Sequence, residues 1–248
     1  MSIFLAGAGP DFDAFPDVFQ RFVQSVSAQQ NKERLHTERP ARIAVVVHHH
    51  SGNPEEALAA YVRPLQTLIS CEVVPVLLAG GSPADPAIFD GVAGIVVGGG
   101  LTPAYLEGLR ACAGTITARV ADGVPYLGFS AGAMIAPARG IIGGYRIDGT
   151  EVCGQECSED LEEVDVRDGL GLAPFAVDVH AAQSGTLSRA AGAVAAGLLD
   201  RAVGVDENTA LCLPDGDATV FEVIGSGNCW DIRRTGEGCS LSVRSANT

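Results

Sequence analysis

The sequence predicts an α/β protein with a mostly parallel central sheet and helices on both faces. Short apolar segments such as 43–47 alternate with amphipathic segments of helical periodicity, an order typical of parallel strands joined by helices. Hydrophobic residues make up 47% of the 248-residue chain, enough for a sizeable core. Because the sequence contains no repeat, linker or break in composition, we expect residues 1–248 to form a single domain.

The first half of the chain alternates strands and helices. Apolar side chains recur on one stripe of 15–29, which predicts a helix. After the strand 43–47, Asn53 as N-cap and Pro54 at the first helical position predict a helix over 53–69. Further strands are expected over 2–7, 72–78 and 94–97, and further helices over 103–113 and 115–121.

The second half begins with a buried strand, a glycine-rich turn over 128–132 and the start of a helix at 133. Strands are expected over 175–179 and 203–206, with a helix over 186–197 between them. The tail 210–243 alternates and contains a Gly-Ser-Gly turn, which predicts late strands in hairpins. The acidic run 156–168 is expected to be a solvated loop or an exposed helix.

Charge and cysteine content restrict the partners and the compartment. A net charge of −14 argues against nucleic acid and anionic membranes as partners. No apolar run is long enough to span a membrane, and Met1–Gly7 lacks the basic start of a signal peptide. Seven irregularly spaced cysteines favour free thiols in a reducing cytoplasm. Cys153 and Cys157 have no second pair at zinc spacing, so we expect neither a metal nor a cofactor.

The segment Gly128-Phe129-Ser130-Ala131-Gly132 is a G-x-S-x-G motif between a predicted strand and a predicted helix. In this context the serine becomes an exposed nucleophile, and the glycines prevent clashes in the tight turn. The backbone amide of Ala131 would point to where an oxyanion develops. The alternative is a glycine-rich turn with an incidental serine.

A serine nucleophile needs a base, and the chain has five histidines. His48, His49 and His50 follow one strand, and His180 ends another, so all lie at carboxyl ends where open α/β sheets form their sites. Three adjacent side chains cannot all face one site, so we expect the triplet to be mainly structural. His180 stands alone and is the better candidate base.

An oxyanion hole needs a second donor from another loop. Gly98-Gly99-Gly100 follows the predicted strand 94–97 and offers backbone amides that can approach a substrate closely. The alternative is that these glycines only form a tight turn. A phosphate-binding loop is not expected, because the Gly-Lys-Ser/Thr of such a loop is absent.

Several ordered segments resemble the serine peptidases that include aspartyl dipeptidase (peptidase E) and cyanophycinase, the S51 type. They comprise the motif around Ser130, the glycine triplet upstream, Gly140-Ile141-Ile142-Gly143-Gly144, the segment 169–180, the segment 204–211 and Ser51-Gly52-Asn53-Pro54-Glu55-Glu56. The resemblance runs from about Arg42 to Leu213 and is closer to cyanophycinase.

The resemblance implies a fold like that of class I glutamine amidotransferases and hydrolysis of amide bonds next to aspartyl residues. It implies Ser130 as nucleophile, His180 as base, and Ala131 with Gly98 or Gly99 as the oxyanion hole. The acid of the triad would lie after Gly144, where Asp148 fits the spacing best and Glu151 is the reserve.

The sequence departs from cyanophycinase where the substrate pocket is shaped. The arginine-rich segment after the family's histidine keeps only Arg189, and Leu101 replaces a polar residue after the glycines. We expect Arg189 to bind a substrate carboxylate, and the acidic run to attract a cationic group.

The function predicted is a cytoplasmic serine hydrolase that cleaves an amide or isopeptide bond in a small aspartyl-type peptide through an acyl-enzyme. Its partner would be a small peptide or amino-acid amide, and a homodimer is allowed for. An esterase or acyltransferase with the same triad and a non-catalytic binding protein on the same fold are the alternatives.

Overall fold

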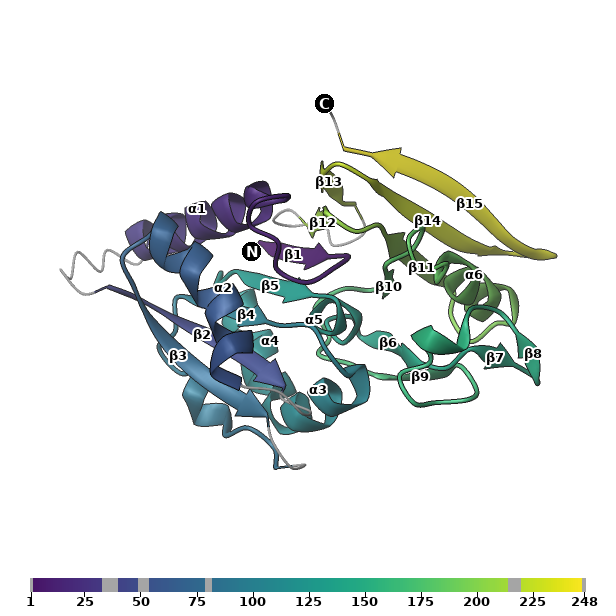
Figure 1. The fold of residues 1–248 in the computed structure, drawn as a ribbon, viewed down its shortest axis with the longest axis horizontal. Helices are drawn as coiled ribbons and strands as arrows, with labels where there is room; N and C mark the ends of the chain where they lie inside the picture. Colours follow the sequence, from purple (N-terminus) through teal and green to yellow (C-terminus); the bar gives the residue numbers. More distant parts are fainter. Residues whose placement is uncertain (1, 33–39, 49–53, 79–81, 214–219, 247–248) are drawn as a thin grey trace.

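Seven strands form the central sheet of the computed structural model, which describes residues 2–32, 40–48, 54–78, 82–213 and 220–246 (Figure 1). Across the sheet the order is β13-β12-β1-β5-β4-β2-β3. The strands are β1 (Ile3–Ala6), β2 (Ala41–His48), β3 (Cys71–Leu78), β4 (Gly94–Val97), β5 (Tyr126–Phe129), β12 (Thr209–Leu213) and β13 (Glu222–Gly225). The first five in the chain pair in parallel, and β12 and β13 extend the sheet antiparallel beyond β1. This confirms the predicted α/β fold with a mostly parallel central sheet.

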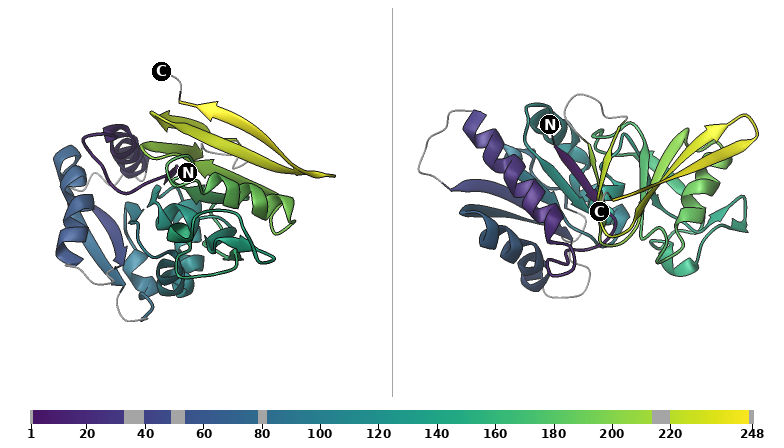
Figure 2. Two further views of the ribbon diagram at one scale, coloured as in Figure 1. Left: turned by 45° about the vertical axis from the view of Figure 1, so that its right-hand side comes forward. Right: turned by 90° about the horizontal axis from the view of Figure 1, so that it is seen from above.

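Helices cover both faces of this sheet (Figure 2). On one face α1 (Pro16–Lys32) and α2 (Pro54–Leu68) cover a core that includes Phe4, Val45 and Phe129. On the other face α3 (Thr102–Leu109), α4 (Ala113–Ala121) and the short α5 (Ala131–Met134) cover a second core that includes Leu5 and Val97. Alternate residues of β1 and β4 enter the two cores because successive strand side chains point to opposite faces. The predicted N-cap Asn53 lies outside the described residues.

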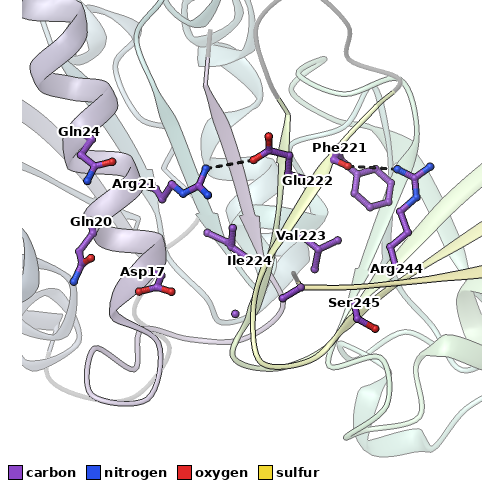
Figure 3. Close-up of a pocket in the computed structure, with 12 residues that line it drawn as sticks. Asp17, Gln20, Arg21, Gln24, Phe221, Glu222, Val223, Ile224, Arg244 and Ser245 are labelled. Carbon is purple, nitrogen blue, oxygen red and sulfur yellow. Dashed lines mark hydrogen bonds and ion pairs between the residues drawn. The ribbon is translucent and has the colours of Figure 1, made fainter. Parts of the chain in front are cut away.

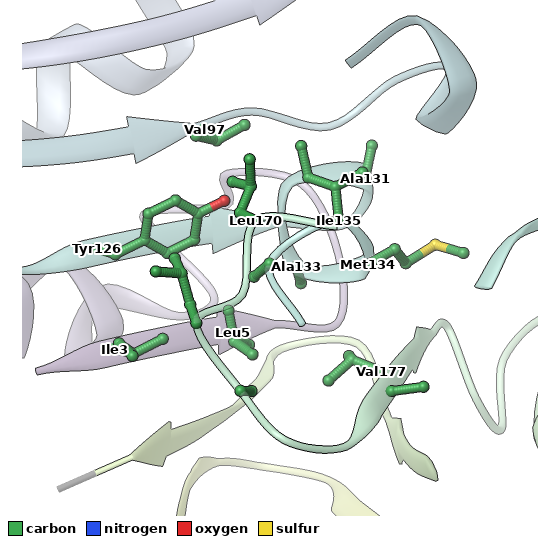
Figure 4. Close-up of a cluster of buried hydrophobic side chains, with 14 of the residues drawn as sticks. Ile3, Leu5, Val97, Tyr126, Ala131, Ala133, Met134, Ile135, Leu170 and Val177 are labelled. Atoms are coloured by element: carbon green, nitrogen blue, oxygen red, sulfur yellow. The ribbon is translucent and has the colours of Figure 1, made fainter. Parts of the chain in front are cut away.

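A second sheet stands beside the first, in the order β10-β11-β14-β15. It contains β10 (Ala176–Val179), β11 (Arg201–Val205), β14 (Asn228–Thr235) and β15 (Gly238–Ser245), with α6 (Leu187–Ala195) packed against it (Figure 1). The strands predicted over 175–179 and 203–206 therefore pair with each other and not with the central sheet. Buried residues of β10 and β11 join the same core as β1 and β5, so one continuous apolar cluster links the two sheets (Figure 4).

Residues 139–168 include the acidic run 156–168, whose structure differs from the loop or exposed helix expected from the sequence. Two small antiparallel ribbons occupy it, β6 (Arg139–Gly143) with β9 (Asp165–Asp168), and β7 (Arg146–Ile147) with β8 (Thr150–Glu151). The acidic run is thus neither a plain loop nor an exposed helix, since it holds the 3₁₀ turn Gln155–Cys157 and ends in β9. Apolar residues alternate with the charged residues of the run and pack against the core, namely Leu161, Val164 and Val166. These contacts fix the acidic run to the body of the protein. The other 3₁₀ turns are Pro86–Phe89 and Arg110–Cys112.

Within the described parts of the chain, no helix combines the length and the apolar character needed to cross a membrane.

Candidate active site

Ser130 occupies a strained turn between β5 and α5. Its backbone has φ 47° and ψ −109°, a conformation that side-chain-bearing residues adopt rarely and mostly at functional sites. A Cβ on Gly128 would lie 2.5 Å from the carbonyl oxygen of Gly132, and one on Gly132 would lie 2.3 Å from that of Val97. Both glycines of the motif are therefore required by close backbone approach, as the sequence predicted.

The side chains of Ser130, His180 and Glu207 form a chain of hydrogen bonds. Ser130 Oγ lies 3.2 Å from His180 Nε2, and His180 Nδ1 lies 2.7 Å from Glu207 Oε1. The His180 and Glu207 side chains are 30% and 40% exposed, so a substrate can reach the site from solvent. A hydroxyl, an imidazole and a carboxylate in this order constitute the geometry of a nucleophile, its base and the group that orients the base.

The carboxyl ends of strands from both sheets bring these residues together. Ser130 follows β5, His180 follows β10, and Glu207 lies two residues beyond β11. The amide of Ser130 donates to the carbonyl oxygen of Ala6, and the amide of His180 donates to that of Gly7. The end of β1 thus aligns the two elements that carry the serine and the histidine.

Asp206 stabilises the loops around Glu207. Its buried carboxylate accepts hydrogen bonds from the amide of Ala182 (3.1 Å), the amide of Asn228 (3.0 Å) and Trp230 Nε1 (2.8 Å). The amide of Glu207 in turn donates to Gln183 Oε1. These bonds join the loop after His180 to the loop after β11, which places Glu207 against His180.

Asp148 and Glu151 do not occupy the position of the acid. Asp148 lies in the turn between β7 and β8 with φ 50°, and Glu151 pairs with Arg146 at 3.0 Å. Spacing from Ser130 misled the prediction because the ribbon β7–β8 carries this segment away from His180. Glu207 could have been found from the rule that selected His180, since it too follows a strand at its carboxyl end.

Two tyrosines hold the turn Gly98–Gly100 beside Ser130. The amide of Gly99 donates to Tyr61 Oη at 2.8 Å, and Tyr105 Oη donates to the carbonyl oxygen of Gly99 at 3.0 Å. The amide of Gly98 donates to the carbonyl oxygen of Val46. Neither predicted amide is therefore available to an oxyanion.

The amides of Ala131 and Gly100 are better candidates for donors to the oxyanion. Within the described residues neither amide has a hydrogen-bond partner. Gly100 also lines the cavity that contains Ser130. The prediction of Ala131 is compatible with the structure, and Gly100 replaces Gly99 as the candidate for the second donor.

A cavity of about 280 Å³ opens at Ser130. It is lined by Gly100, Ser130, Met134, Glu156, Cys157, Glu159, Val179, His180, Ser184, Thr186 and Arg189. A larger, polar cavity of about 760 Å³ lies between α1 and β13, where Arg21 pairs with Glu222 (Figure 3). It contains none of the three hydrogen-bonded residues, so the smaller cavity is the candidate active site.

Arg189 borders the cavity, but its guanidinium is bonded to other groups of the protein. Its guanidinium forms two hydrogen bonds with Asp178, at 2.9 and 2.7 Å, and also donates to the carbonyl oxygens of Gly144 and Cys157. Arg189 is 2% exposed and Asp178 is fully buried. Burial would lower the pKa of Arg189, but Asp178 outweighs it and raises that pKa. Because Asp178 already pairs with this guanidinium, the structure argues against Arg189 as the group that binds a substrate carboxylate.

Glu159 gives the cavity an acidic wall. Its carboxylate accepts hydrogen bonds from the amide and the hydroxyl of Thr102, both at 3.0 Å. Burial raises the pKa of Glu159, and the bonds from Thr102 oppose that rise. Glu156 is exposed on the same wall. Part of the acidic run therefore borders the site, as the sequence suggested.

Among the described residues, His48 and the cysteines form no set of metal ligands. The amide of His48 donates to Tyr105 Oη, and its ring lies against that tyrosine, while His36, His49 and His50 lie outside the described residues. All seven cysteines are free. In the described part of the chain, no group of three or more histidine, cysteine or acidic side chains is placed to hold a metal ion.

Comparison with known proteins shows the family and the fold. The model of peptidase family S51 matches residues 52–221. The chain belongs to peptidase family S51. A solved structure of a peptidase from an acI-B1 Actinobacterium is similar with a TM-score of 0.69 at 15% identity, covering 100% of this chain and 95% of that one.

A putative peptidase E protein from Listeria monocytogenes EGD-e is also similar, with a TM-score of 0.52 at 15% identity, covering 99% of this chain and 98% of that one. No curated protein matches the chain. At these identities the solved structures support the S51 fold, and the family resemblance predicted from the sequence is confirmed. The closer likeness to cyanophycinase stays a prediction.

Replacing the buried arginine tests its structural role. We expect Arg189→Leu to destabilise the protein by about 3–5 kcal/mol, because it leaves the Asp178 carboxylate buried without a partner. Thermal unfolding would show this as a fall in Tm on the order of 10 °C. Arg110→Leu, at an exposed arginine paired with Glu107, serves as control. A stable Arg189→Leu protein with only a raised KM would restore the substrate-binding role.

Proposed function

We propose that this S51 peptidase is a serine hydrolase in which Ser130 attacks a peptide bond, His180 transfers the proton and Glu207 orients His180. The observation that carries the proposal is the continuous bond chain from Ser130 Oγ through both ring nitrogens of His180 to Glu207. The strained backbone of Ser130 supports it, because such conformations persist where function requires them.

The mechanism follows from the order of these three groups, because a carboxylate beside Nδ1 favours the tautomer in which Nδ1 carries the proton. Glu207 accepts a hydrogen bond from Nδ1–H of His180 and keeps the ring in the tautomer whose Nε2 is unprotonated. This nitrogen takes the hydroxyl proton of Ser130 as Ser130 Oγ attacks the carbonyl carbon. The amides of Ala131 and Gly100 stabilise the negative oxygen of the tetrahedral intermediate. His180 then gives the proton to the leaving amine, the acyl-enzyme forms, and water activated by His180 releases the acid.

The substrate we propose is a small peptide with a cationic group close to the scissile bond, most simply a free α-amino group. Glu159 and Glu156 support this, because they line the cavity at Ser130. The cavity's one lining arginine is paired with Asp178 and offers no charge to a carboxylate. The aspartyl-type substrate implied by the family resemblance is kept as a proposal, with recognition through the amino group in place of Arg189.

The structure offers little support for the alternative of an esterase or acyltransferase. A leucine at position 101, where the family has a polar residue, would favour a less polar pocket and hence an esterase. Leu101, however, lines a cavity together with Glu156 and Glu159. The free state of all seven cysteines supports a reducing cytoplasm, which we retain as a proposal.

The function is tested by labelling and hydrolysis together. A fluorophosphonate probe should label the wild-type protein at Ser130, and Ser130→Ala should lose labelling and lower kcat by a factor on the order of 10⁶. Ser184→Ala, at another serine of the same cavity, is the matched control and should label normally. An unlabelled wild-type protein would point to the non-catalytic binding protein.

The identity of the acid is tested by amide substitutions. Glu207→Gln should lower kcat by a factor on the order of 10⁴, because the wrong histidine tautomer would face Ser130. Asp148→Asn should keep nearly full activity, since Asp148 lies in the β7–β8 turn. The reverse ranking in steady-state kinetics would return the role to Asp148.

The tyrosines that hold the glycine turn act as positioning residues. Tyr61→Phe should lower kcat by about 10- to 100-fold while KM hardly changes, because a shifted Gly100 amide would lose its aim at the oxyanion. Tyr145→Phe, at a buried tyrosine outside the cavity, should leave both parameters unchanged. A Tyr61→Phe protein with wild-type kcat would show that the turn holds its shape without this bond.

The charge of the substrate is tested at Glu159. Glu159→Gln should raise KM for a peptide with a free amino group by about tenfold, the loss of roughly one charged contact. KM for the N-acetylated peptide should not rise. Asp160→Asn, at the exposed neighbour of Glu159, is the control. Equal effects on both peptides would remove Glu159 from substrate recognition.

A further inference from the structure

Strand β15 is a long edge strand without the usual protection against pairing. It pairs only with β14 and ends the order β10-β11-β14-β15, and the β14–β15 hairpin projects from the molecule (Figures 1 and 2). The strand has eight residues, Gly238 to Ser245, with no proline, no lysine and one charge, at Arg244. Such edges offer unpaired backbone donors and acceptors to another strand.

The other three edges of the two larger sheets are protected or short. Strand β3 carries Pro75, which has no amide proton, and the charged Glu72. Strand β13 has four residues and lies beside α1, and β10 lies against β6. Among the described strands of these sheets, β15 therefore has the one long edge open to pairing.

The side chains of β15 make this edge partly apolar. Leu241 and Val243 are each 50% exposed and lie opposite Ile232 and Trp230 of β14. Because paired residues share a face, these four side chains form one apolar row on the side where α6 packs. An open groove of about 490 Å³ continues the row, lined by residues that include Leu187, Ala191 and Leu241.

We propose that two copies of this chain pair antiparallel through β15, forming a continuous eight-stranded sheet across a two-fold axis at Ser242. In this register Leu241 lies opposite Val243 of the second copy, Ser242 lies opposite its own counterpart, and Arg244 lies opposite Ser240. The apolar residues meet each other, and no like charges are opposed. A register shifted by one residue would turn the apolar row to the wrong face of the second copy.

The charge of the hairpin also favours a second copy at this edge. The whole chain has a net charge of −14, so two copies repel each other over most of their surfaces. The hairpin residues 228–245 contain three arginines (Arg233, Arg234 and Arg244) against Asp231 and Glu237. This region carries a formal charge of about +1, so two copies that meet here repel each other less than the net charge of the whole chain implies.

Sedimentation of the full chain tests the pairing. The wild-type protein should sediment as a dimer that dissociates on dilution, and Leu241→Arg and Val243→Arg should each weaken association by at least about 100-fold, because a charge would enter the apolar seam. Leu77→Arg, at a leucine 49% exposed on the other outer strand β3, should leave the dimer intact. Circular dichroism and hydrolysis confirm that each variant is folded.

Cross-linking tests the register without adding charge. In a Cys239→Ser background, Ser242→Cys should form an intermolecular disulfide on mild oxidation, since the two residues face each other across the axis. Ser240→Cys should not, because its two copies would lie four residues apart along the seam, which is about 14 Å at 3.4 Å per residue. A monomer at every concentration, a dimer unaffected by both arginine variants, or cross-linking at 240 in place of 242 would each overturn the proposal. A β15 edge that pairs with added peptide while the chain stays monomeric would also overturn it.

Discussion

The close approach of backbones at Gly7 is the constraint on which the site depends. A Cβ at this position would lie 2.1 Å from the carbonyl oxygen of Asp206 and 2.6 Å from that of Val205. Gly7 donates to the carbonyl oxygen of Thr209 and accepts from the amide of His180, and its neighbour Ala6 accepts from the amide of Ser130. Only glycine allows the end of β1 to approach the loop after β11 this closely, so Gly7 helps to set the distances between Ser130, His180 and Glu207.

The buried pair of Arg189 and Asp178 explains why the pocket is acidic. Arg189 lies on α6 and Asp178 on β10, and the guanidinium also reaches the carbonyl oxygens of Gly144 and Cys157. One cation thus holds the segment 139–168 against the second sheet. Because it is fully paired, it adds no positive charge to the cavity, whose remaining charged wall is Glu156 and Glu159.

Local chemistry was predictable from the sequence, and long-range placement was less so. The serine turn, the isolated His180 and the alternating elements depend on neighbours in the chain, and the structure has them as predicted. Glu207 and Gly100 replace Asp148 and Gly99 because their roles depend on how distant strand ends meet and on which amides Tyr61 and Val46 already occupy. The pairing of Arg189 was unpredictable for the same reason, since no pattern in the sequence indicates that Asp178, 11 residues earlier, is its buried partner.

The second sheet links the acid of the site to the surface of the molecule. Trp230 and Asn228 of β14 donate to Asp206, the residue directly before Glu207. The same strand pairs along its full length with β15, the open edge. A strand added to β15 would restrain the hairpin, and the hairpin restrains Asp206, so Glu207 would lose part of its freedom before any substrate binds. The proposed pairing of two copies at β15 would thus be linked to Glu207 through the β14–β15 pairing and the buried carboxylate of Asp206.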